Sequence, residues 1–295
     1  MDNRKPRAVT TIGICSGKGG VGKTNIAVNL AAVLGARGKE TLLLDADLGL
    51  SNVEILMGFQ PKATSEQVIQ GECELDDVMV EAAPGVRVIP SAAGVSAMAD
   101  LSHQEQAGLI NAFSGTRHQP EYLIVDMAAG INRSVLGFGA AVQHVVGVVN
   151  EDPASITDAY GLIKSLNKLG VNRFSVIANM VDSETRAREV YHRLLRATDR
   201  FLSVAVTYLG MVPRDQQVVT AIQSRQPVMQ AYPGSPASKA FVRLASNLER
   251  AICPSLMSGR VEFFVESLVA MQRAAGAIPP ASTLTPAATL QGGFA

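Results

Sequence analysis

The stretch that decides the fold is Gly17-Lys18-Gly19-Gly20-Val21-Gly22-Lys23-Thr24. An apolar run precedes it and an apolar-periodic run follows it, so the order is strand, glycine loop, helix. The spacing between the first glycine and the final Gly-Lys-Thr is that of a phosphate-binding P-loop. In such a loop the backbone N–H groups turn toward one anion, and the helix N-terminus adds partial positive charge. The alternative, an ordinary glycine-rich turn, is disfavoured by so specific an eight-residue match.

The side chains of this loop predict a nucleoside triphosphate bound with Mg²⁺. Lys23 would reach the β- and γ-phosphates, and Thr24 would ligate the metal. Lys18 is an additional feature, because one phosphate site does not require a second lysine at this point. The expected nucleotide-binding residues of the loop are Gly17, Lys18, Gly19, Gly20, Val21, Gly22, Lys23, Thr24 and Asn25.

Composition limits the class of protein. The chain has 295 residues, 47% of them hydrophobic, which allows one large α/β domain or two small ones. The formal net charge is zero, so no global field attracts nucleic acid or anionic lipid. The three cysteines, Cys15, Cys73 and Cys253, form no CxxC pair, which argues against disulfides and structural zinc. We therefore expect a reduced, cytoplasmic setting.

Apolar runs of strand length alternate with helical patterns along the chain. The expected strands are 9–15, 41–44, 86–89, 122–125, 145–149, 174–178 and 204–209. The expected helices are 22–37, 104–114, 132–142, 154–168, 183–200 and 236–252, with short helical pieces and loops over 51–82. Because most strands are continuously apolar, we predict an α/β P-loop NTPase fold, with a mostly parallel twisted sheet flanked by helices on both faces.

The chain divides into four predicted parts. Residues 1–8 are expected to be a flexible tail and 9–253 the P-loop ATPase domain. A C-terminal amphipathic helix is expected over 254–275 and a disordered tail over 276–295. Within the helix, the apolar residues that follow helical spacing are Val261, Phe264, Val265, Leu268 and Met271.

Carboxylates at two strand ends complete the predicted site. Asp45 and Asp126 each follow an apolar strand, where ligands of open parallel sheets bind. Asp126 has the position of the carboxylate that holds Mg²⁺ in P-loop enzymes. Asp47 is our candidate for positioning the attacking water, and Gly130 would donate a backbone N–H near the γ-phosphate. The alternative for each aspartate is a helix N-cap. The expected metal-site residues are Thr24, Asp45, Asp47 and Asp126, and the expected catalytic residues are Asp47, Lys18 and Lys23.

Three segments of the chain resemble the deviant-Walker-A ATPases of the MinD/ParA family. They are the P-loop with Lys18, the 45–52 segment Asp-Ala-Asp-Leu-Gly-Leu-Ser-Asn and the 126–130 segment Asp-Met-Ala-Ala-Gly. The chain is most similar to the FleN/FlhG flagellar number regulators within that family. The segments behind this narrower resemblance are 151–160, 177–180, 212–215 and 259–269. The resemblance covers roughly residues 9–270.

This resemblance implies an ATP-driven switch between monomer and homodimer. Lys18 of one protomer would reach the phosphates bound to the other, and Glu151 could touch the partner's nucleotide. Asn179 would recognise adenine, and a loop of Pro213, Arg214 and Asp215 would close over the base. The chain has Ala128 where many family members have proline, which implies a looser loop.

The resemblance also implies partners. The first expected partner is a FleQ-type σ54-dependent AAA+ transcription activator, which the ATP-bound dimer would restrain. The second expected partner is an FlhF-type GTPase. Residues 1–10 contain no glutamine, so the GTPase stimulation seen with some relatives is not expected here. The main alternative is a positioning or segregation ATPase acting on a membrane or DNA. Iron–sulfur delivery would need cluster cysteines, which three isolated ones do not supply.

Two segments leave alternatives open. The 260–274 helix is either docked under nucleotide control, with some membrane contact at the inner membrane or cell pole, or packed permanently on the domain. The 183–200 helix carries Arg186, Arg193, Arg196 and Arg200 near one face. That face is a solvated surface or a partner-protein surface. Direct DNA binding is not expected, because the net charge is neutral.

Overall fold

The computed structural model describes residues 9–47, 53–63, 67–68, 71–90, 111–113, 115–252 and 261–276. Its strands are β1 (Thr10–Ser16), β2 (Thr41–Ala46), β3 (Val80–Ala83), β4 (Val86–Ile89), β5 (Tyr122–Ala129), β6 (His144–Val149), β7 (Arg173–Val181) and β8 (Ala205–Pro213). Its helices are α1 (Lys23–Ala36), α2 (Val53–Met57), α4 (Leu75–Val78), α7 (Arg133–Ala141), α8 (Pro153–Lys168), α9 (Glu184–Phe201), α10 (Gln216–Gln223), α11 (Val228–Ala231), α12 (Pro236–Ala251) and α13 (Val261–Gly276).

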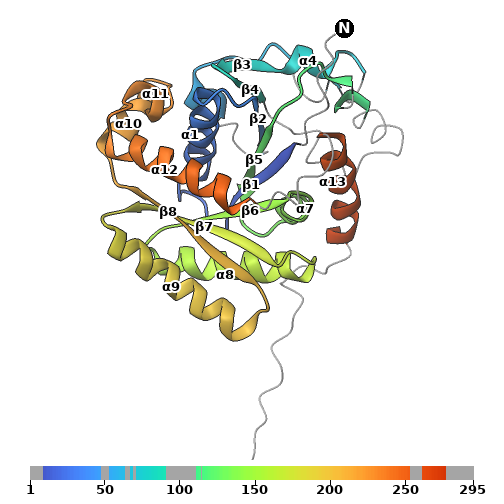
Figure 1. Ribbon diagram of the computed structural model, residues 1–295. Coiled ribbons are helices and arrows are strands. Elements are labelled where there is room, and N and C mark those ends of the chain that lie inside the picture. Colours follow the sequence, from blue (N-terminus) through green and yellow to red (C-terminus); the bar gives the residue numbers. More distant parts are fainter. Residues whose placement is uncertain are drawn as a thin grey trace, which may run out of the picture.

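The strands form a single eight-stranded sheet in the order β3-β4-β2-β5-β1-β6-β7-β8. Every neighbouring pair is parallel except β3 and β4, which are antiparallel. Helices cover both faces of this sheet, with α1 and α12 on one side and α7, α8, α9 and α13 on the other (Figure 1). The predicted fold class, a mostly parallel sheet with flanking helices and a C-terminal helix, is confirmed.

Burial explains why the central strands read as continuous apolar runs. All seven residues of β1 and all six of β2 are buried, because helices cover both of their faces. The apolar core is therefore divided into two layers by the sheet. The layer under α1 and α12 includes Ile26, Leu30 and Phe241, each 0% exposed.

Several expected boundaries are wrong. β2, β5, β7 and β8 continue past the expected strand ends, so Asp45, Asp126 and Asn179 lie within strands, not after them. The strands extend because each keeps its ladder partner over the additional residues. β3 falls within a segment expected to contain only helical pieces and loops, and α10 and α11 fall where no element was expected. Most of the expected helix 104–114, together with the expected tails, lies outside the described residues.

α13 packs on α7 through a small apolar contact. Phe264, Val265 and Leu268 are at most 3% exposed, and the Phe264 ring stacks on Phe138 with centroids 6.4 Å apart. The expected amphipathic helix is therefore present over 261–276 and docked, and the first part of the expected range, 254–260, lies outside the described residues. Within the described part of the chain, no helix has the length and apolarity needed to cross a bilayer.

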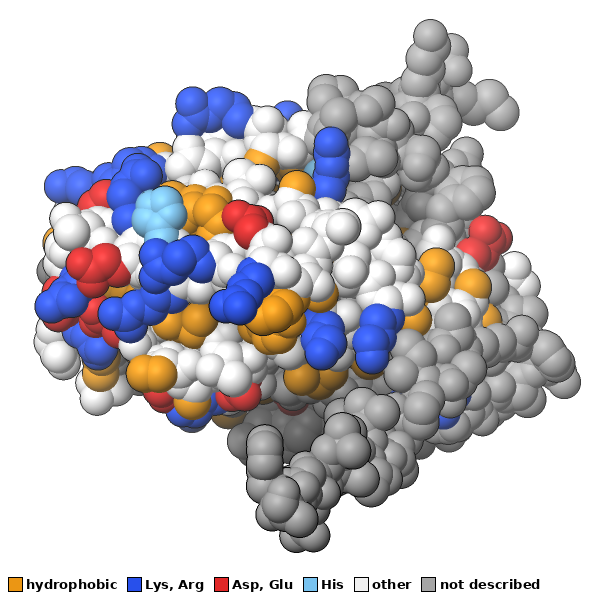
Figure 2. All heavy atoms as spheres, turned by 90° about the horizontal axis from the view of Figure 1, so that it is seen from below, with side chains coloured by type: hydrophobic (Ala, Val, Ile, Leu, Met, Phe, Trp, Pro, Cys, Tyr) orange, Lys and Arg blue, Asp and Glu red, His pale blue; other side chains and the backbone are white. Residues whose placement is uncertain are grey.

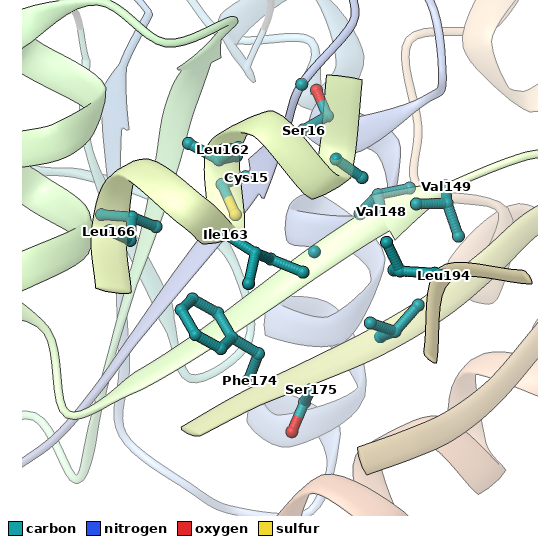
Figure 3. Close-up of a pocket in the computed structure, with 14 residues that line it drawn as sticks. Cys15, Ser16, Val148, Val149, Leu162, Ile163, Leu166, Phe174, Ser175 and Leu194 are labelled. Atoms are coloured by element: carbon teal, nitrogen blue, oxygen red, sulfur yellow. The ribbon is translucent and has the colours of Figure 1, made fainter. Parts of the chain in front are cut away.

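A small apolar cavity lies behind the glycine loop, between α8 and strands β1, β6 and β7 (Figure 3). Its volume of about 10 Å³ is close to that of one water molecule. The side chains of Cys15, Leu162, Ile163 and Phe174 face it, and burial raises the pKa of the Cys15 thiol to about 12. This cavity is too small and too apolar to be the nucleotide site.

Candidate nucleotide-binding site

The glycine loop connects β1 to α1 at the carboxyl edge of the sheet. Gly20 and Gly22 have φ angles of 77° and 84°, which glycine adopts readily. A Cβ at Gly17 would lie 2.2 Å from the carbonyl carbon of Asp158 in α8. The Ser16 hydroxyl donates to the Lys18 carbonyl oxygen over 2.9 Å. The loop is therefore held in a strand-to-helix turn that needs glycine, as the spacing predicted.

Lys23 lies at the N-terminus of α1 with its ammonium directed at two carboxylates. Its Nζ donates to Asp126 Oδ1 over 2.7 Å and lies 3.8 Å from Asp47 Oδ2. The Lys23 side chain is only 6% exposed. These carboxylates supply the negative charge that the β- and γ-phosphates would otherwise present to this lysine. The structure thus brings together three of the predicted site residues.

Asp126 fits a role at a metal. It is fully buried in β5, and its Oδ2 has no hydrogen-bond partner among the described residues. Burial raises the pKa of Asp126, while the charge and hydrogen bond of Lys23 oppose that rise. No three histidine, cysteine or acidic side chains of the described residues converge to hold a metal by themselves. The arrangement of Asp126 beside the P-loop fits an Mg²⁺ ion that Thr24 and phosphate oxygens would ligate, with the Asp126 carboxylate beside it.

Asp45 and Asp47 lie on the strand next to Asp126. Asp45 in β2 is 1% exposed and is the direct neighbour of Asp126 in the parallel ladder. Its Oδ1 accepts a hydrogen bond from the Asp47 backbone N–H over 3.1 Å. The Asp47 side chain is 24% exposed, so it can reach solvent water beside the phosphate position. Asp45 therefore shapes the turn that presents Asp47.

Lys18 has an intramolecular partner that the sequence did not predict. Its ammonium donates to Asp152, the residue that caps the N-terminus of α8, and both side chains are 41% exposed. The hydrogen bond from Lys18 is the main cause that lowers the pKa of Asp152. Asp152 followed by proline does signal a helix start, but nothing in the sequence indicates that Asp152 pairs with Lys18. Glu151 is half-buried and directly precedes this cap.

The remaining predicted residues lie around the same edge. Asn179 in β7 donates from Nδ2 to the Val21 carbonyl oxygen over 2.8 Å, which ties the adenine candidate to the P-loop. Gly130 donates its N–H to the Ser16 carbonyl oxygen over 2.9 Å, so in this state the donor expected at the γ-phosphate is engaged.

The loop predicted to close over the base has contacts of its own. The Asp215 carboxylate accepts from Gln217 N–H over 2.9 Å and from Ala237 N–H over 3.0 Å, so it caps α10 and holds the start of α12. Arg214 Nε lies 3.3 Å from Asp182 Oδ1, and Pro213 ends β8. The structure places this loop next to β7, where the Arg214 N–H donates to the Val181 carbonyl oxygen over 3.2 Å.

The fold and the site define a P-loop nucleotide-binding protein, and comparison with known proteins agrees. Residues 12–228 match the family model of the CobQ/CobB/MinD/ParA nucleotide binding domain. The chain is 48% identical over 262 residues to antiactivator FleN of Pseudomonas aeruginosa, covering 88% of this chain and 94% of that protein. It is 31% identical over 258 residues to the flagellum site-determining protein YlxH of Helicobacter pylori, covering 86% and 87% of the two chains.

Solved structures support the same fold. MinD of Pyrococcus horikoshii, solved in complex with Mg-ADP, has a TM-score of 0.66 and 23% identity over 82% of this chain and 97% of its own. The chain therefore belongs to the MinD/ParA family of nucleotide-hydrolysing P-loop proteins. Within that family it is a member of the FleN/FlhG group.

Proposed function

We propose that this protein is a slow, ATP-dependent dimerising ATPase that limits flagellar number by binding and antagonising a FleQ-type AAA+ transcription activator. The observation that carries the proposal is the 48% identity to an antiactivator over nearly the full length of both chains. The P-loop, Asp47 and Asp126 supply the nucleotide chemistry that such a switch requires.

The site residues divide the chemistry between them. Thr24 would ligate Mg²⁺, with Asp126 beside it, and the metal would neutralise phosphate charge. The Lys23 ammonium would turn from the carboxylates to phosphate oxygens bound at the N-terminus of α1. Asp47 accepts a hydrogen bond from the attacking water and orients it. Hydrolysis then removes the γ-phosphate, and the switch returns to its ADP state.

Lys18 links nucleotide state to assembly. In the dimer we propose that it leaves Asp152 and contacts the phosphates bound by the partner subunit. The half-exposed position of both side chains supports this exchange, because little buried surface has to open. Glu151 adjoins this region and would lie near the same interface. ATP would then join two protomers, and ADP would let them separate.

The outer face of α8 and α9 is a candidate surface for the activator. Lys and Arg side chains gather on this face beside hydrophobic patches (Figure 2). On α9, Arg186 and Arg188 pair with Glu189 and Glu184 in the same helix. Arg193, Arg196 and Arg200 add further positive charge, and the nearby Phe201 is 64% exposed. An acidic partner surface with an apolar centre would complement this arrangement.

The direct test is a pull-down of purified AAA+ activator with the ATP-loaded and ADP-loaded protein. We expect retention with ATP and loss of retention in an Arg193→Ala/Arg196→Ala variant whose ATP hydrolysis is unchanged. Arg243→Ala, an exposed arginine on α12, serves as the matched control. Strong, salt-sensitive DNA binding without activator binding would overturn the proposal.

A positioning ATPase acting on a membrane is the second candidate. The observation that favours it is 29% identity over 247 residues to septum site-determining protein MinD of Synechocystis, together with an apolar α13 helix. In either case we propose a cytoplasmic protein that can lie at the inner membrane or cell pole. An FlhF-type GTPase is a further proposed partner. Co-sedimentation with vesicles, in place of activator binding, would favour this candidate.

A further inference from the structure

Met180 has a backbone conformation that side chains with a Cβ seldom adopt. Its φ is 55°, and in the described part of the chain the only other non-glycine residue with positive φ is Arg225. Arg225 lies just after α10, where a left-handed residue is an ordinary helix ending. Met180 instead lies inside β7, where the register with β8 shifts between Asn179 and Val181. Such strain persists only where the surrounding structure enforces it, and it clusters at functional sites.

The strained residue sits against the P-loop. A Cβ built on Gly22 would lie 2.3 Å from Asn179 Nδ2 and 3.9 Å from Met180 Cε. In a regular strand, successive side chains point to opposite faces of the sheet. Here two successive side chains reach the same turn of the loop. The irregularity at Met180 therefore lets both side chains occupy the space that a side chain at position 22 would need.

The hydrogen bond of Asn179 determines what its amide can still recognise. One amide N–H is given to the Val21 carbonyl oxygen, over 2.8 Å. An asparagine amide has a second N–H and a carbonyl oxygen, so one donor and one acceptor remain for a ligand. Adenine presents an amine donor next to a ring-nitrogen acceptor, whereas guanine presents two acceptors there. An amide fixed in this way would pair with adenine and face O6 of guanine with its oxygen.

We propose that Met180 is a positioning residue whose left-handed backbone fixes the Asn179 amide against Val21 and so makes the site select adenine over guanine nucleotides. The inference rests on the proposed ATP-binding function. Met180 would act through Asn179 and not by touching the nucleotide itself.

The test measures dissociation constants for Mg-ATP and Mg-GTP by calorimetry. Met180→Val places a β-branched residue at a positive φ, which it tolerates poorly. We expect it to reduce the ATP-over-GTP preference by roughly 5- to 150-fold, the range for one misread base. Met180→Gly, which adopts this φ freely, should keep the wild-type preference. Met180→Ala, a milder strain, should give a smaller loss and covers the case in which the valine variant does not fold.

Two controls separate positioning from simple destabilisation. Arg225→Val introduces the same backbone strain at a helix end and should leave the preference unchanged. In an Asn179→Ala background, Met180→Val should cause no further loss, because the residue through which it acts is gone. Two results would overturn the inference. In one, Met180→Val lowers the melting temperature but keeps the ATP-over-GTP preference. In the other, the losses of preference caused by Asn179→Ala and Met180→Val add in the double variant. A wild-type chain that binds neither nucleotide would instead overturn the proposed function.

Discussion

The Lys18 ammonium and the Asp152 carboxylate pair within one chain, where the P-loop meets the start of α8. A lysine held in this way cannot at the same time contact a neighbouring protomer. In the proposed switch, the pair would therefore favour the monomer over the dimer that Lys18 would complete. Because both side chains are 41% exposed, the pair is weak enough for ATP binding to break.

We expect Asp152→Asn to shift the equilibrium toward the dimer at a given ATP concentration. The amide oxygen can still cap α8, so the change removes the charge and keeps the helix start. Light scattering over an ATP titration measures the shift. Asp199→Asn, a change of the same type at an exposed position on α9, serves as the control. A dimer that forms at the same or a higher ATP concentration in Asp152→Asn would argue that the pair does not restrain Lys18.

The same pair should have a defined pH window. Pairing lowers the pKa of Asp152 and raises the pKa of Lys18, in each case mainly through their shared hydrogen bond. The contribution of Asp152 to stability is therefore present above its unfolded pKa of about 3.9 and is lost as pH falls through the folded pKa. That of Lys18 is present below its unfolded pKa of about 10.4 and is lost as pH rises through the folded pKa. An NMR titration should find the pKa of Asp152 below its ordinary value, and Lys18→Ala should raise it, although the Ala154 N–H continues to lower it. An Asp152 pKa that is the same in the wild type and in Lys18→Ala would show that the two groups do not pair in solution.

Lys23→Ala should abolish ATP binding and also destabilise the nucleotide-free protein. The charge-assisted contact to phosphate is worth about 1.5–3 kcal/mol. Removing Lys23 also leaves the buried Asp126 carboxylate without its partner, which costs about 3–5 kcal/mol. Urea unfolding and ATP titration measure the two effects. Adding Asp126→Asn to Lys23→Ala should recover stability but not ATP binding. If Lys23→Ala alone unfolds at the same urea concentration as the wild type, the Lys23–Asp126 pair does not stabilise the nucleotide-free protein.

Asp47→Ala should keep ATP binding and dimerisation while slowing hydrolysis by about 10²–10⁴-fold. The Asp47 side chain is 24% exposed and lies 3.8 Å from the Lys23 ammonium, which keeps its 2.7 Å hydrogen bond to Asp126. Removal of Asp47 should therefore leave Lys23 in place to contact the phosphates. Single-turnover phosphate release measures the rate. In cells this variant should suppress flagellar genes, whereas loss of ATP binding should give extra flagella. A variant that hydrolyses ATP at the wild-type rate would remove Asp47 from the mechanism.

The docking of α13 on α7 can be tested through Phe264. Replacing it with alanine removes the stacking on Phe138 and should loosen the helix, which hydrogen exchange over 261–276 would detect. If docking is under nucleotide control, ATP should increase exchange in the wild-type helix and promote binding to vesicles. Phe138→Ala, on α7 itself, tests the other side of the contact. Equal protection with ATP and ADP would favour permanent packing.

Much of the fold could be predicted from local patterns. The alternation of buried strands and helices and the P-loop spacing identify the parallel sheet and the phosphate site. Strand ends were placed too early because Asp45, Asp126 and Asn179 are polar, and only the neighbouring strands show that the ladder continues through them. The edge strand β3 has a weak apolar pattern, since only one of its four residues is buried.

The contacts that hold the site together were harder to predict. The pair of Lys18 with Asp152 spans 134 residues, and the hydrogen bond of Asn179 to Val21 spans 158. Each depends on which strands become neighbours in the sheet, and no local spacing encodes that. Asp215 was expected to lie over the adenine base of the nucleotide. Its contacts with the N-termini of α10 and α12 follow only from how these two helices meet.

Sedimentation velocity of the Asp47→Ala chain with Mg-ATP or Mg-ADP tests the switch most directly, because hydrolysis is slowed and the nucleotide state is fixed. A dimer of the 31.1 kDa chain should form with ATP and a monomer should remain with ADP. Adding Lys18→Ala should give a monomer that still binds ATP, whereas Lys62→Ala, an exposed lysine outside the P-loop, should leave the dimer intact. A chain that remains monomeric with saturating Mg-ATP would contradict an ATP-closed dimer.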